Sequence, residues 1–394
     1  MNKRSIVSLI LLFLSTVACT RYVPVYPYGP GRPPGGHSGH SRGRSTSFFM
    51  ASDRHENGQG NNLRALLDTA VKSSAVMPGV VILNGDHVGG GRTPHPDFTV
   101  SDIYQEIDSV LNTNTVDVIL GYGSHDTGCT DGYEAFLSGP RRCDGYYVYG
   151  ISFAQMSFAT DSAAVAAIEA GRNADDSDEG HDGPPDGGGE PPSDGGQDGS
   201  PGPPPGGKGY SGLDTLDRRG LSAESATKNF SQWVGSLSDN APIVVMSHMP
   251  LHAHRKDNLG ASVWLKALKR AARRHDVIVL WAHNHTVEQG RPGEESSENA
   301  HIERSNYLLV PGDSIYVQSP VDSVSVGDVI NFTYVNDGYL KLGYGSIVTF
   351  TDTRGDGRYD RMRIERFTVN PADSLIGTFG DTRWRNPYVT SLRY

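Results

Sequence analysis

Five short apolar runs, each followed within a few residues by Asp or His, constrain this chain more than any other feature. Each run is rich in β-branched residues and too short for a helix, which is typical of strands buried on both faces of a sheet. The runs and their polar groups are 47–51 with Asp53-Arg54-His55, 80–83 with Gly85-Asp86, 116–120 with Gly123-Ser124-His125-Asp126, 243–246 with His248, and 277–281 with His283-Asn284-His285.

Helices are predicted between these strands, at residues 62–72, 100–111, 222–237 and 261–274. Strands that alternate with helices indicate an α/β fold. In such folds ligands gather beyond the carboxyl ends of the strands. We therefore expect the five polar groups to converge on one rim of the protein.

The polar groups offer oxygen and imidazole nitrogen but no thiolate, which suits Zn, Mn or Fe better than calcium. Six donors exceed what one tetrahedral ion uses. Two ions about 3.5–4 Å apart, sharing a carboxylate, would use them all. The six donors are Asp53, His55, Asp86, His248, His283 and His285.

In this order the motifs resemble the calcineurin-like metallophosphoesterase family, whose pattern is D-x-H, G-D, G-N-H-D/E, a lone His and G-H-x-H. The resemblance covers about residues 50–290, apart from an insertion. It implies a four-layer sandwich of two mixed β-sheets flanked by helices. It also implies a hydrolase that attacks phosphate esters with a metal-bridging hydroxide, on a monoester, a diester or a pyrophosphate.

The resemblance implies a role for each residue. Those roles are Asp53, His55 and His285 for the first of two divalent ions, Asp86 for the bridge, Ser124, His248 and His283 for the second ion, and His125 for the acid, oriented by Asp126. Ser124 stands where the family has Asn, and a hydroxyl is a weaker ligand than an amide carbonyl. We therefore expect a second site that is looser or completed by water.

Four further polar residues are candidates for lining the pocket. Arg54 could contact phosphate, and His87, His252 and His254 follow the same strands. For each of them a solvated loop residue is the alternative.

The first residues predict export. Lys3 and Arg4 precede an apolar run that is too short to span a bilayer, which is typical of a signal peptide over residues 1–18. Thr16-Val17-Ala18-Cys19 resembles a bacterial lipobox, although the family prefers Leu where Thr16 stands. Lipidation of Cys19 would anchor the protein to a membrane of the cell envelope, and plain secretion is the alternative.

Two further cysteines remain, Cys129 and Cys143. In an oxidising compartment they could pair and close a short loop beside His125. Two free thiols are the alternative.

Two segments lack the composition of a folded domain. Residues 19–46 are rich in Pro and Gly and predict a tether. Residues 171–210 hold 21 Gly and Pro residues and nine acidic residues against Arg172 and Lys208, a net charge of −7 out of −10 for the chain. This predicts a disordered insertion within one domain. An acidic chain is a poor general binder of nucleic acid.

The domain is predicted to span residues 47–370, with a tail at 371–394. Alternating runs at 329–334, 339–342, 347–351 and 362–369 predict strands that complete the second sheet, with a separate binding domain as the alternative. Residues 335–339 and 352–357 are predicted to be turns, although the second resembles a calcium loop.

A second function is compatible with these motifs. The chain could be a non-catalytic envelope lipoprotein that uses the fold as a binding surface, and Ser124 supports this alternative. The presence of His125, which binds no metal in the family, favours the enzyme. The sequence contains no information on oligomeric state.

Overall fold

The computed structural model describes residues 43–55, 62–87, 100–128, 136–152, 223–252, 260–285, 307–318, 325–369 and 387–393. They belong to one compact unit, Arg42–Tyr394. The predicted signal peptide with Cys19, most of the tether, the insertion at 171–210, Cys129 and His254 lie outside them. Within the described ranges, no helix is long and apolar enough to cross a membrane.

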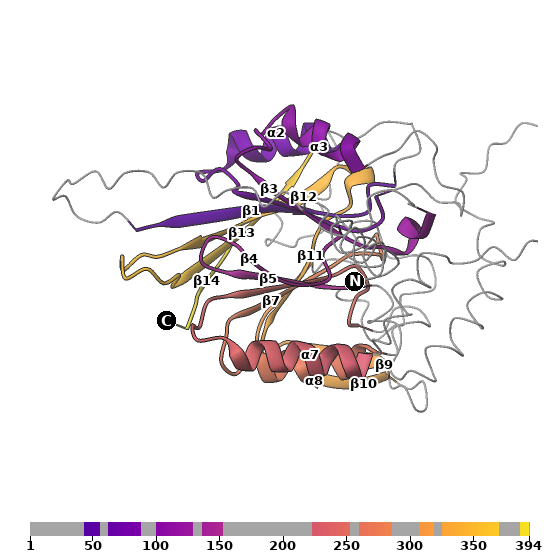
Figure 1. The fold of residues 1–394 in the computed structure, drawn as a ribbon, viewed down its shortest axis with the longest axis vertical. Coiled ribbons are helices and arrows are strands. Elements are labelled where there is room, and N and C mark those ends of the chain that lie inside the picture. Colours follow the sequence, from indigo (N-terminus) through magenta and orange to yellow (C-terminus); the bar gives the residue numbers. More distant parts are fainter. Residues whose placement is uncertain are drawn as a thin grey trace, which may run out of the picture. The chain divides into compact units, whose positions relative to one another are not determined.

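The first of two six-stranded mixed sheets has the order β14-β13-β12-β1-β2-β3 (Figure 1). Its neighbours β1, β2 and β3 are parallel, whereas β12, β13 and β14 join antiparallel. The strands are β1 Ser45–Ala51, β2 Val80–Asn84, β3 Asp117–Gly121, β12 Tyr344–Thr351, β13 Arg361–Thr368 and β14 Tyr388–Ser391.

The second sheet has the order β4-β5-β6-β7-β11-β8. Its four central strands are parallel, and β4 and β8 are antiparallel edges. The strands are β4 Gly139–Arg142, β5 Tyr147–Ile151, β6 Ile243–Ser247, β7 Val277–Trp281, β8 Leu308–Leu309 and β11 Thr333–Asn336. A separate pair consists of β9 Ser314–Gln318 and β10 Ser325–Val329.

Helices cover the outer face of each sheet (Figure 1). α2 (Leu63–Ser73) and α3 (Val100–Asp108) share an apolar cluster with the first sheet. α7 (Ala223–Ser236) and α8 (Ala261–Ala271) share another with the second sheet. A third cluster lies between the two sheets. The predicted four-layer sandwich is therefore confirmed.

Strand β1 shows why its residues are apolar on both faces. Phe48 and Met50 belong to the cluster between the sheets, whereas Phe49 and Ala51 belong to the cluster under α2 and α3. All four side chains are fully buried. Because successive side chains of a strand point to opposite faces, only a continuous apolar run fits a strand with layers on both sides.

The five predicted strands and four predicted helices are all present, with ends shifted by no more than three residues. Of the four later strands, 347–351 and 362–369 are present as β12 and β13, whereas 329–334 is strand only at Val329, which ends β10, and at 333–334, where β11 begins. Residues 340–342 form a 3₁₀ helix, η4 (Leu340–Leu342), and not a strand, because the Tyr339 carbonyl accepts hydrogen bonds from the N–H groups of Leu342 and Tyr344 at 3.1 and 3.0 Å. The β12 and β13 strands join the first sheet, and β11, starting at Thr333, joins the second. The predicted tail contributes the edge strand β14.

The turn predicted at residues 352–357 is confirmed as the hairpin between β12 and β13. The Asp352 carboxylate accepts hydrogen bonds from the backbone N–H groups of Gly355 and Gly357, at 2.6 and 2.7 Å. Both of its oxygens are thus used within the turn, which argues against a calcium loop.

Truncation of Phe48 tests the central layer. Its ring is fully buried and lies 5.8 Å from Tyr146 and 6.1 Å from Phe350, between ring centroids. Because Phe48→Ala leaves a cavity between the sheets, we expect the free energy of unfolding to fall by about 3–5 kcal/mol, measured by urea denaturation. As a control, Met77→Ala, at a side chain that is 57% exposed, should change it by less than about 0.5 kcal/mol.

Candidate metal centre

The polar groups predicted from the sequence do converge. Their donor atoms form three groups in which every atom lies within 4.8 Å of the others. These groups are Asp53 with His55 and His285, His55 with Asp86 and His125, and Asp86 with His248 and His283. The first and third groups correspond to the two metal sites that the sequence predicts, and residues from both sheets contribute to each of them.

Asp86 lies between the two groups of histidines. Its Oδ2 is 3.1 Å from His248 Nε2 on one side and 3.8 Å from His55 Nε2 on the other. Its Oδ1 accepts a hydrogen bond of 2.8 Å from the backbone N–H of His125. The Ser124 hydroxyl lies 3.3 Å from both carboxylate oxygens. This is the arrangement expected of a carboxylate shared by two cations.

Asp53 supports the fit of a cation most directly. Its Oδ2 accepts hydrogen bonds from the Ser52 hydroxyl at 2.7 Å and the His283 N–H at 3.3 Å. Its Oδ1 is buried and accepts no hydrogen bond from the described residues. Instead Oδ1 faces His285 Nε2 at 3.3 Å and His55 Nε2 at 3.7 Å. A buried carboxylate oxygen surrounded by imidazoles is suited to a metal ion.

The histidine rings also direct a nitrogen atom towards the predicted metal sites. His55 Nε2 and His285 Nε2 lie only 2.8 Å apart, so both nitrogens point to one place. His248 Nδ1 lies 2.7 Å from the Asn84 carbonyl oxygen and donates its proton there. With Nδ1 so occupied, Nε2 is the nitrogen left to bind a cation, the usual arrangement for a histidine ligand.

The backbone around the donors is strained. The non-glycine residues with positive φ in the described ranges are all predicted ligands: Asp53, His55, Asp86, His283 and His285, with φ from +44° to +74°. Such conformations cost roughly 1–3 kcal/mol each and cluster at functional sites. No sequence pattern reports them directly.

Two glycines allow the loops to approach one another. A Cβ on Gly85, where φ is +87°, would lie 2.7 Å from both His248 Nδ1 and the Gly123 nitrogen. A Cβ on Gly123 would lie 2.1 Å from Asp86 Oδ1. Close packing therefore requires glycine at both positions, and the positive φ adds a conformational requirement at Gly85.

His125 and Asp126 are placed differently from each other. The His125 side chain is 38% exposed, and its ring lies edge-on to that of His55, with centroids 4.8 Å apart. Asp126 is fully buried, and its carboxylate accepts hydrogen bonds of 2.8–2.9 Å from the N–H groups of Asp86, His87 and Gly123. These bonds fix the loop that carries Asp86. Orientation of His125 by Asp126 stays a prediction.

The electrostatics of the metal-free site are dominated by opposed charges. Burial alone would raise the pKa of Asp53, but His285 and His55 hold it below its ordinary value. Burial likewise opposes protonation of His248, yet the Asp86 and Asp53 carboxylates raise its pKa to about 10. Burial, aided by the charge on His248, lowers the pKa of His283 to about 3.

The candidate pocket residues are more buried than the sequence predicts. Arg54 is 5% exposed and forms an ion pair with Glu106 of α3. His87 is buried and bonds the Gly121 carbonyl oxygen through Nε2. Neither is a solvated loop residue. Contact of Arg54 with substrate stays a prediction.

His252 is fully buried on the second sheet. Its Nδ1 lies 2.8 Å from the Tyr334 hydroxyl, and its Nε2 lies 3.0 Å from the amide nitrogen of Asn284. Because Asn284 lies between His283 and His285, these bonds favour a structural role for His252 over substrate contact.

Cys143 is a free thiol in this structure, and its predicted partner Cys129 lies outside the described residues. The disulfide stays a prediction. Burial raises the pKa of Cys143 to about 12, so its thiol is a poor nucleophile at neutral pH.

Sequence reasoning did not identify the residues that support the donors. Asn84 and Ser52 each immediately precede a motif, and the ring of Tyr339 stacks on that of His285, with centroids 4.3 Å apart. A polar residue at the buried end of β2 is the sequence signal that could have revealed Asn84. For Tyr339 no such signal exists, because it lies far along the chain in a predicted turn.

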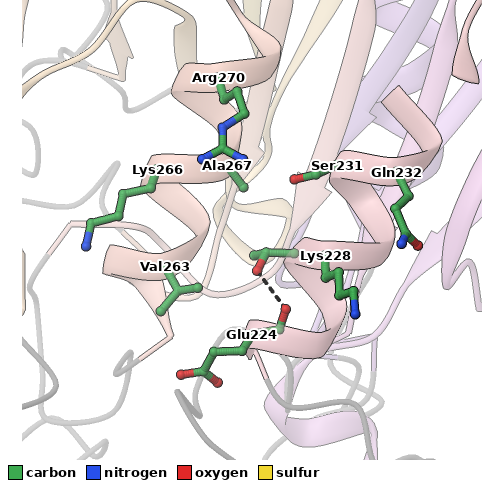
Figure 2. Close-up of a pocket in the computed structure, with 9 residues that line it drawn as sticks. Glu224, Lys228, Ser231, Gln232, Val263, Lys266, Ala267 and Arg270 are labelled. Carbon is green, nitrogen blue, oxygen red and sulfur yellow. Dashed lines mark hydrogen bonds between the residues drawn. The ribbon is translucent and has the colours of Figure 1, made fainter. Parts of the chain in front are cut away.

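A groove between α7 and α8 lies apart from this cluster (Figure 2). Lys228 and Gln232 of α7 and Lys266 and Arg270 of α8 line it, and none of the predicted site residues does so. These four side chains are exposed at the surface, whereas the predicted metal donors are buried or half-buried.

Fold and site together define a phosphate-ester hydrolase. The sequence of residues 46–287 matches the model of the Calcineurin-like phosphoesterase family, and the chain belongs to that family. A search of the curated proteins found no match. Among solved structures, the phosphopantetheinyl hydrolase PptH from Mycobacterium tuberculosis aligns at 16% identity, over 75% of this chain and 91% of that chain, with a TM-score of 0.33. This similarity is too low to transfer a substrate.

The shifted pKa of His248 predicts a pH effect on the metal-free protein. A folded-state pKa of about 10, above the ordinary 6.5, means that protonated His248 stabilises the fold fully below pH 6.5. That contribution is lost as the pH rises towards 10. His248→Gln cannot titrate, so its free energy of unfolding should fall less over this range than that of the wild type. Urea denaturation in chelator checks this, and equal pH slopes would contradict it.

Proposed function

We propose that this protein is a dinuclear, metal-dependent phosphoesterase. The observation that supports it best is the Asp86 carboxylate, which lies between His248 on one side and His55 on the other. A shared carboxylate between two groups of imidazoles is the arrangement that two-metal hydrolases use. The family membership makes a phosphorylated molecule the substrate.

The chain supplies a complete set of donors for two ions. Those for the first are Asp53, His55 and His285, with Asp86 shared, and those for the second are His248, His283 and Ser124. When bound, two divalent cations such as Mn, Zn or Fe would lower the pKa of a water molecule and offset charge on the phosphoryl oxygens. The mixed nitrogen and oxygen donors favour these metals over calcium.

His125 is the acid in this proposal. It is more exposed than the donors beneath it, so its imidazole can reach a bound ester. Its backbone N–H is fixed on Asp86 Oδ1, which holds the residue beside the donors. An imidazole there can donate a proton to the leaving alkoxide, a role for which histidine is well suited.

Ser124 is the weak donor of the set. Its hydroxyl is within 3.3 Å of both oxygens of Asp86, so it adjoins the shared carboxylate but offers only a neutral oxygen. We expect the second ion to bind less tightly than the first. Among the predicted site residues, Ser124 is the one that supports the alternative of a non-catalytic protein.

Hydrolysis of p-nitrophenyl phosphate and its bis-ester by the full chain, with added Mn or Zn, tests this function. We expect turnover that chelator abolishes and that His125→Ala lowers by about 10²–10⁴ in kcat, because an acid of this kind contributes that much. The preferred ester would identify the substrate as a monoester or a diester.

Lys72→Ala is the control, because this exposed residue of α2 pairs, among the described residues, only with Asp68 on the same helix. No turnover with any metal, from folded protein that binds two ions, would contradict the enzyme and favour a binding lipoprotein.

We further propose that the protein is exported and anchored to the cell envelope by lipid on Cys19. The lipobox-like Thr16-Val17-Ala18-Cys19 after a short apolar run supports this. Radiolabelled palmitate should enter the wild type in a bacterial host and be absent from Cys19→Ala, which should move to the soluble fraction. Labelling of the variant would contradict the proposal.

A further inference from the structure

We propose that the segment Asp337-Gly338-Tyr339, called here the brace, positions the ligands of both predicted metal sites. The inference rests on the proposed metal centre. The brace lies outside residues 46–287, which match the family model. It connects β11 of the second sheet to β12 of the first, by way of η4. Because this connection passes from one sheet to the other beside the predicted ligands, it can contact the ligands that follow either sheet.

Asp337 contacts the half of the site that holds His248. The amide nitrogen of Asn84 donates hydrogen bonds to Asp337 Oδ2 at 2.5 Å and to the Ser247 carbonyl at 2.9 Å. The backbone carbonyl oxygen of the same Asn84 accepts a hydrogen bond from His248 Nδ1. The Asp337 N–H bonds the carbonyl of Trp281, at the end of the strand that leads to His283.

Gly338 contacts Asp53 through one hydroxyl. The Ser52 Oγ lies 2.8 Å from the Gly338 carbonyl oxygen and 2.7 Å from Asp53 Oδ2. The one proton of this hydroxyl is shared between the two oxygens or alternates between them, so Ser52 links Gly338 to Oδ2 while Oδ1 turns to the imidazoles. Gly338 has a φ of +119°, and a Cβ there would lie 2.5 Å from the Tyr344 carbonyl oxygen, so this position requires glycine.

Tyr339 contacts the histidines of the first site. Its ring stacks on that of His285, with an interplanar angle of 3°, and lies edge-on to that of His55 at 6.3 Å. Tyr339 is 4% exposed. A buried, flat ring against His285 limits rotation of the imidazole, which keeps Nε2 pointed at Asp53 Oδ1.

Metal titration of the chelator-treated full chain, followed by calorimetry with Mn or Zn alone, tests the brace. Loss of such a supporting contact lowers metal affinity by about 10–100-fold. We expect Tyr339→Leu to weaken the first site by that factor and Tyr339→Phe, which keeps the ring, to stay within about threefold of wild type. Asp337→Ala should weaken the second site, and Asp337→Asn should restore it, because the amide oxygen still accepts from Asn84.

Variants that retain only one of the two metal sites show which site each substitution affects. In His248→Ala, which leaves the first site, Tyr339→Leu should still lower affinity. In His285→Ala, which leaves the second, it should have no effect. Tyr104→Leu, at an exposed tyrosine of α3, is the matched control. A ring that merely stabilises the fold would lower the unfolding midpoint in chelator without this site selectivity.

The outcomes separate the brace from the proposed function. A wild-type chain that binds no metal overturns the proposed function. A wild type that binds two ions, with unchanged affinity in Tyr339→Leu, overturns the brace alone. If Tyr339→Leu does not fold, Ser52→Ala replaces it, because it removes only the hydroxyl between Asp53 and Gly338. Wild-type affinity of the first site in Ser52→Ala would then overturn the brace.

Discussion

The arrangement of the site depends on the interaction between the Asp86 carboxylate and the imidazoles on either side of it. Asp86 is 1% exposed, and its neighbours His248, His125 and His55 hold its pKa well below the ordinary value against the effect of burial. A buried carboxylate without such partners would cost several kcal/mol. Because Asp86 follows β2 in one sheet and His248 follows β6 in the other, this contact also links the two sheets at the site.

The residues that form this contact adopt an unfavourable backbone conformation. Five predicted ligands adopt left-handed φ, and Gly85 and Gly123 provide the space in which the loops meet. The three N–H bonds to the buried Asp126 stabilise the same loop. Three apolar clusters fill the sandwich, and their burial offsets the strain at the rim.

Much of this could be predicted from the sequence, but not evenly. Strand β7, and β2 up to Leu83, are continuous apolar runs, as expected for a sheet covered on both faces. The structure of the segments after residue 329 was harder to predict. The segment 339–342 is predicted as a strand, but residues 340–342 form η4. Strand β12 joins the first sheet and not the second, because pairing between distant strands leaves no local pattern. His87 and His252 were predicted near the pocket and are buried, since exposure depends on what packs over a residue.

The sequence by itself determined which donors the chain has and that they follow strands, because apolar periodicity and motif order are local properties. The tertiary structure decided which donors share a centre, with Asp86 between the two groups. It also decided that Asp337, Gly338 and Tyr339, some 50 residues beyond His285, lie against them. Contacts between the two sheets depend on how the layers pack, and no local pattern in the sequence reveals which residues of the two sheets meet.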